Sequence, residues 1–89
     1  MNTLTRINPL GHKYMLVRQA GGKTLVITGT KQVTMDMTLE DMSQCWYNWQ
    51  MQRQNIQIAF AQLGPEQREF LMTGITPSEW NEIFKEKED

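Results

Sequence analysis

The pattern of apolar and polar positions changes twice along this 89-residue chain. Residues 1–12 show neither a strand period nor a helix period, and we expect a flexible arm there. Residues 13–37 alternate between apolar and polar side chains, which is typical of strands with one buried face. Residues 38–86 place apolar side chains three and four positions apart, which predicts helices. The sequence therefore predicts one α+β domain over residues 1–89, in which an N-terminal antiparallel β-hairpin or three-stranded sheet packs on three or four C-terminal helices.

The alternating region contains a turn signal, Gly21-Gly22. It separates the first strand, 13–19, from the β-branched run 24–28, and a glycine pair favours a tight turn because glycine adopts positive φ without strain. Residues 31–37 resume the alternation and predict a third strand. Strands joined by such short turns are antiparallel neighbours in a sheet.

The helical region opens with a capping signal. The Thr38 hydroxyl can accept from the backbone amide of Asp41, so a helix should begin directly after this threonine. An apolar stripe then runs through 39–63, and Arg53 is the only member that interrupts it. Because the surrounding stretch 52–55 is fully polar, one continuous helix and two helices joined at an angle both stay open.

Two shorter helices should follow. A Gly-Pro pair precedes the predicted helix at 65–73, and Gly74 is suited to end it. Thr76, Pro77 and Glu79 then form a start signal for a last helix, with the threonine as cap and the glutamate reaching back to the threonine amide.

The chemistry available to the chain is limited, since it contains one histidine, His12, and one cysteine, Cys45. A metal site needs several converging ligands and a nucleophile needs a base beside it, so we expect no metal, no cofactor, no catalytic residues and no enzyme activity. A buried position beside Trp46 explains the cysteine better. A lone cysteine fits the cytoplasm. Residues 1–10 lack the apolar core of a signal peptide and no apolar run is long enough to span a membrane, so we expect neither export nor a membrane partner.

The aromatic residues predict both a core and a binding surface. Most of the core should come from Trp46, Trp49, Phe60, Phe70, Trp80 and Phe84. Tyr47 cannot share a helix face with its two tryptophan neighbours. Together with Met51 and Ile58 it would form a second apolar patch, and interfaces favour tyrosine and methionine. These three residues are the candidate partner-binding residues. Burial under the hairpin and a homo-oligomer formed through the patch stay open as alternatives.

A basic surface on the hairpin is the basis of the alternative function. The formal net charge of -1 argues against a domain built to neutralise phosphates. However, Arg18, Lys23 and Lys31 could share the hairpin region, and Tyr14 beside them could stack on a base. These four residues are the candidates for a nucleic-acid-binding regulator that uses the hairpin face.

The C-terminal half contains a string with the pattern IQxAFxxL, REFLxTGITP and WxxIF. Its members are Ile56-Gln57, Ala59-Phe60, Leu63, Arg68-Glu69-Phe70-Leu71, Thr73-Gly74-Ile75-Thr76-Pro77, Trp80 and Ile83-Phe84. This string, about a third of the chain, resembles a motif in a family of small, functionally uncharacterised bacteriophage proteins. The chain departs from the family in Ala61, where a proline is common, and in 52–55, where a shorter link with glycine is usual.

The resemblance implies a bacteriophage origin and no particular activity. Within the motif, Arg68 and Glu69 are the polar members best suited to a role beyond the fold, although a structural ion pair explains them better. The leading expectation is a non-enzymatic phage accessory protein in the host bacterial cytoplasm that acts by protein-protein interaction. Its partner would be a host or phage protein, either a host or defence factor that it inhibits or a neighbour in the virion.

Overall fold

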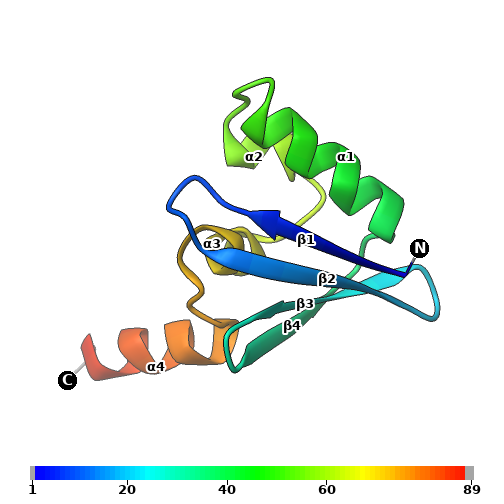
Figure 1. Cartoon of the computed structure of the whole chain (residues 1–89). Helices are drawn as coiled ribbons and strands as arrows, with labels where there is room; N and C mark the ends of the chain where they lie inside the picture. Colours follow the sequence, from blue (N-terminus) through cyan, green and yellow to red (C-terminus); the bar gives the residue numbers. More distant parts are fainter. Residues whose placement is uncertain (1, 88–89) are drawn as a thin grey trace.

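The computed structural model describes residues 2–87, with the backbone alone for residues 84–87. Within this range four strands come first and four helices follow, so the protein has the α+β fold that the sequence predicts (Figure 1). The strands are β1 (Thr3–Ile7), β2 (Lys13–Gln19), β3 (Lys23–Thr28) and β4 (Lys31–Met35). The helices are α1 (Leu39–Gln50), α2 (Ile56–Ala59), α3 (Pro65–Thr73) and α4 (Pro77–Lys87).

The strands form one antiparallel sheet in the order β1-β2-β3-β4. The predicted hairpin is β2 and β3, and Gly21 and Gly22 turn between them with φ of 77° and 74°. The predicted third strand is β4, which pairs with β3. Side chains alternate as expected, with Tyr14 and Leu16 of β2 buried and Met15 between them exposed.

The expectation of a flexible arm at residues 1–12 is wrong. β1 pairs with β2 along its whole length, and Asn8 then anchors the turn that follows. The buried Asn8 amide donates to the backbone carbonyls of Leu71 and Met72, each at 2.9 Å, and its Oδ1 accepts from two backbone amides of the turn. Leu71 lies 63 residues beyond Asn8 in the sequence, so a local pattern could not predict this contact.

The core lies between one face of the sheet and the first three helices. Five rings form a continuous cluster in it, with centroids 5.2–6.1 Å apart: Tyr14, Trp46, Trp49, Phe60 and Phe70. Such edge-to-face contacts add to the stabilisation that comes from burying large apolar surfaces. Trp80 was expected among them, but it is only half-buried and lies outside this core. The side chain of Phe84 lies outside the described part.

The apolar stripe after Thr38 belongs to two helices. α1 ends at Gln50, and Arg53 adopts a left-handed φ of 56° in the link. The Oδ1 atom of Asn55 then accepts from the backbone amide of Gln57 at 2.9 Å and caps α2. The polar stretch therefore separates two helices, which answers the question that the sequence left open.

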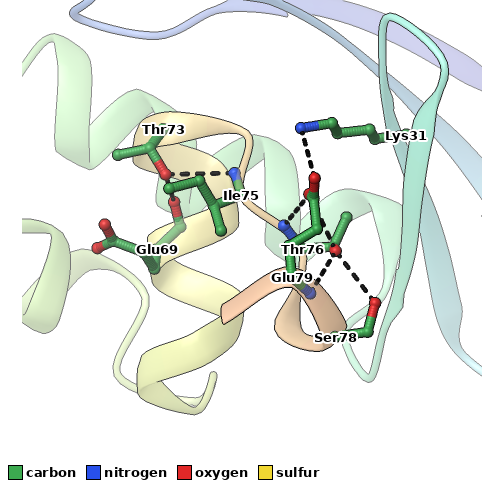
Figure 2. A network of polar contacts seen from close by, with 7 residues as sticks. All are labelled: Lys31, Glu69, Thr73, Ile75, Thr76, Ser78 and Glu79. Atoms are coloured by element: carbon green, nitrogen blue, oxygen red, sulfur yellow. Dashed lines mark hydrogen bonds and ion pairs between the residues drawn. The ribbon is translucent and has the colours of Figure 1, made fainter. Parts of the chain in front are cut away.

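A network of polar contacts links α3, α4 and the sheet (Figure 2). Gly74 ends α3 with φ of 79°, as predicted. Thr76 and Glu79 form the expected reciprocal cap, since the Glu79 amide donates to Thr76 Oγ1 at 3.2 Å and the Thr76 amide donates to Glu79 Oε1 at 3.0 Å. Glu79 also pairs with Lys31 of β4, with Nζ and Oε2 3.1 Å apart. These contacts hold the first turn of α4, which extends away from the other helices in Figure 1.

Candidate protein-binding surface

Two of the candidate partner-binding residues lie on the outward side of α1, Tyr47 within the helix and Met51 as the residue that caps its C-terminal end. Trp46 and Trp49 face the core, so the intervening positions turn outward. Tyr47 is 50% exposed and Met51 is 68% exposed. Because the two residues are four positions apart, they lie next to each other on the helix surface. This pair is therefore an exposed apolar surface, as the sequence predicts.

A hollow of about 330 Å³ lies between β1 and α1 beside this pair. It is lined by Arg6, Ile7, Ser43, Trp46, Tyr47, Gln50 and Met51, and we call it the β1–α1 hollow. The indole Nε1 of Trp46 donates to the Ile7 carbonyl at 3.3 Å and so fixes the helix against the strand. Ile7 is 57% exposed, and the strand alternation places its side chain on the sheet face of Thr5 and Met15. Sequence reasoning missed the contribution of β1 because it assigned these residues to an arm.

Ile58 does not join the other two candidates. It lies on α2 and its side chain is 66% exposed, but it does not line the β1–α1 hollow. Its proposed place on the same surface assumed that helical periodicity continued from α1. The link at residues 51–55 breaks that periodicity. The structure thus brings Tyr47 and Met51 together and leaves Ile58 apart.

Two polar side chains of the hollow have unused hydrogen-bonding capacity. Arg6 donates to the Thr5 carbonyl at 2.8 Å and to Ser43 Oγ at 3.4 Å, and no carboxylate of the described residues pairs with it. Gln50 Nε2 is buried and has no hydrogen-bond partner among the described residues. An unpaired buried donor typically costs about 1–3 kcal/mol, so it marks a place where a binding partner can supply the missing acceptor.

Tyr14 cannot stack on a base as the nucleic-acid alternative requires. Its ring is fully buried, and its hydroxyl donates to the Phe70 carbonyl at 2.7 Å. Burial raises the pKa of this hydroxyl to about 12. The residue joins the sheet to α3, so its assignment to a nucleic-acid surface is wrong.

The three basic candidates do not form one surface either. Arg18 pairs with Glu40 of α1, and Lys31 pairs with Glu79. Lys23 is exposed at the start of β3, whereas Lys31 lies opposite the last residue of that strand. Five residues of extended chain separate strand positions by about 17 Å. Lys23 and Lys31 therefore lie at opposite ends of β3, and Arg18 and Lys31 are each paired with a carboxylate.

The remaining polar residues singled out in the sequence have structural roles or lie at the surface. Cys45 is half-buried against the core, and burial raises the pKa of its thiol, with Asp41 adding to the effect. A raised thiol pKa makes a poor nucleophile at neutral pH. His12 is exposed in the turn after β1. Arg68 donates to the Leu63 carbonyl, and this bond supports the loop before α3.

A second apolar surface lies on the sheet face away from the helices. Met15 is 44% exposed there, and pairing places Ile27 opposite it, while Val17 and Leu25 form the next row. Antiparallel sheets often expose one face, but that face usually alternates to polar residues. A smaller hollow of about 270 Å³ lies on this face beside Met15 and Ile27, with Lys13 in its lining, and it lacks the buried unpaired amide of the β1–α1 hollow.

Comparisons of the chain with protein-family models, curated proteins and solved structures found no match. Among the described residues, no three histidine, cysteine or acidic side chains are grouped as metal ligands would be. No helix in this part of the chain is both long and apolar enough to cross a membrane.

Proposed function

We propose that this protein is a non-enzymatic bacteriophage accessory protein that binds another protein through the β1–α1 hollow. The observation that supports this most is the pair Tyr47 and Met51 at a concave surface, with half or more of each residue exposed. Interfaces typically draw their affinity from a few such anchors, and tyrosine and methionine are favoured there. The C-terminal resemblance supports the phage origin and, with it, action in the host bacterial cytoplasm.

The hollow suits a protein partner better than the other surfaces do. It combines apolar side chains at its rim with the polar groups of Arg6 and Gln50 inside. A partner that fills it would exclude water from the rim and satisfy the buried amide. The hollow on the sheet face away from the helices is smaller and has no buried unpaired amide in its lining, and the basic candidates of the sheet are already paired or far apart.

Affinity capture from nuclease-treated host lysate tests the proposal, with the full chain as bait and mass spectrometry as the readout. We expect one protein in stoichiometric amount, lost with Tyr47→Glu and with Met51→Glu. Met15→Glu is the matched control, because it places the same charge at a comparably exposed apolar residue outside the hollow. That variant should capture the partner as the wild type does.

Other outcomes would reject the proposal or change it. Loss with Met15→Glu and retention with Tyr47→Glu would move the interface to the open sheet face. If size-exclusion chromatography shows an oligomer that Tyr47→Glu dissociates, the hollow serves self-assembly instead. A bait that captures nothing from lysate and is absent from mature phage particles would contradict a protein-binding role.

A further inference from the structure

We propose that the β1–α1 hollow recognises an acidic peptide segment, with an apolar side chain in the hollow and a carboxylate at Arg6. This identification of the partner's chemistry rests on the proposed protein-binding function. The proposal adds which side chains of the partner are bound and which residues of this chain bind them.

The first reason to infer an acidic partner is the charge of the hollow. Arg6 is the one charged residue in its lining, and no acidic residue of the described chain pairs with this guanidinium. A guanidinium offers five donors, and the bonds to Thr5 and Ser43 leave several of them unused. The chain as a whole has a formal net charge of -1, so this positive charge is local. A carboxylate is the group that such a fork binds best.

The second reason to infer an acidic partner is the buried amide of Gln50. Its Nε2 has no partner in the described part of the chain, and it belongs to the same lining as Arg6. Gln50 thus lines the hollow with an amide nitrogen that lacks an acceptor, and because this nitrogen is shielded from solvent, the side chain has to rotate to meet an oxygen of the partner. Arg6 and Gln50 both require an oxygen acceptor from the partner, and a carboxylate or its neighbouring backbone carbonyl can supply it.

The hydrogen bonds at the edge of β1 favour a partner that inserts a side chain over a partner that adds a strand to the sheet. Asn2 and Asn8 form backbone hydrogen bonds toward β2 and its turn, so the carbonyls of the odd-numbered residues between them point outward. Of these, the Thr5 and Ile7 carbonyls already accept bonds from side chains of this chain. An added strand would have to share both carbonyls with these bonds, whereas an inserted side chain leaves them as they are.

Selection from a displayed library of random short peptides against the purified full chain tests the proposal. We expect enriched peptides to place an aspartate or glutamate within two positions of a large apolar residue. Binding of a labelled enriched peptide should weaken about 10- to 100-fold with Arg6→Gln, the range of a charge-assisted hydrogen bond. Enriched peptides that are basic or uncharged, or no enrichment at all, would overturn the proposal.

Gln50→Met provides a readout that a merely structural role would not produce. The change keeps the length of the side chain and removes the buried unpaired donor, so the free protein should melt at the same or a higher temperature while peptide affinity falls about 10-fold. Gln50→Glu, which retains oxygen atoms but no donor, should also lose binding. Gln44→Met on the exposed side of α1 is the control and should change neither property.

The two proposals fail in different ways. Lysate capture that depends on Tyr47, together with selected peptides that lack acids, would reject the acidic partner and keep the protein-binding function. If the Gln50→Met variant binds the peptide with wild-type affinity, the Gln50 amide takes no part in recognition. If both capture and selection fail, the hollow is not an interface.

Discussion

Helices α1 and α4 begin with the same local signal and contribute to the molecule in different ways. Each follows a threonine whose hydroxyl accepts from the backbone amide three residues later: Thr38 from Asp41 at 3.1 Å, and Thr76 from Glu79 at 3.2 Å. α1 then buries four apolar side chains in the core, while none of the described α4 side chains is fully buried. Equal start signals therefore say where a helix begins but not how much it stabilises the fold, because most helical stability comes from tertiary packing.

The largest expected effect is on the packed helix. Trp46→Ala should lower the free energy of unfolding by about 3–5 kcal/mol, because it removes a ring that contacts three other aromatic rings. Ile83→Ala on α4 should change it by less than about 0.5 kcal/mol, since that side chain is exposed. Urea unfolding followed by circular dichroism measures both. Similar losses of unfolding free energy in the two variants would show that the Ile83 side chain is packed in solution rather than exposed.

An intermediate effect should follow from the caps. Thr38→Ala should destabilise the whole domain by about 1 kcal/mol, because α1 unfolds only with the core. Thr76→Ala should instead increase hydrogen exchange within α4 and leave the urea midpoint almost unchanged.

Thr38→Ser and Thr76→Ser are the matched controls for the two caps, because serine retains the accepting hydroxyl. Both should behave as the wild type. A lower urea midpoint with Thr76→Ala would contradict the separation of α4 from the cooperative core.

The smallest effect concerns pH at the start of α4. Hydrogen bonding to the Thr76 amide, with Lys31 adding to it, lowers the pKa of Glu79. A depressed pKa in the folded state means that the contribution is complete above the unfolded value, near 4.3, and is lost as pH falls through the folded value. Exchange of the first α4 amides should therefore accelerate at acidic pH, after correction for the intrinsic rate.

The Glu79→Gln variant should remove this pH dependence. NMR titration of the carboxyl groups adds a second check. The same titration should show a lowered pKa for Glu40, about 2, because this carboxylate accepts hydrogen bonds from Arg18. A Glu79 that titrates at the ordinary value would show that the network in Figure 2 does not persist in solution.

Features that depend on neighbouring residues were predicted well. The turn at Gly21-Gly22, the end of α3 at Gly74 and the cap at Thr76 were all read correctly, because their bonds join residues within a few positions. The outward position of Tyr47 followed from helix geometry in the same way. β1 was missed because its turn is anchored by Asn8 on α3, far along the chain.

The candidate site was predicted only in part for the same reason. Met51 caps the helix that contains Tyr47 and its amide donates to the Tyr47 carbonyl, so their proximity follows from spacing alone. Arg6 and Gln50 come from different elements, and only the position of α1 beside β1 brings them into one hollow. Tyr14 has the residue type of a stacking platform, yet burial under α3 gives it a structural role.

The sequence by itself determined the class of fold, the order of β2 to β4 and the helices, and the apolar side chains that α1 turns outward. Only the tertiary structure decided that the first residues form a strand, that Tyr14 is core, and that Ile7 and Arg6 complete a hollow with α1. The physical reason is that periodicity, turns and caps are interactions within a few residues, whereas burial and hydrogen-bond partners depend on which distant segments pack together.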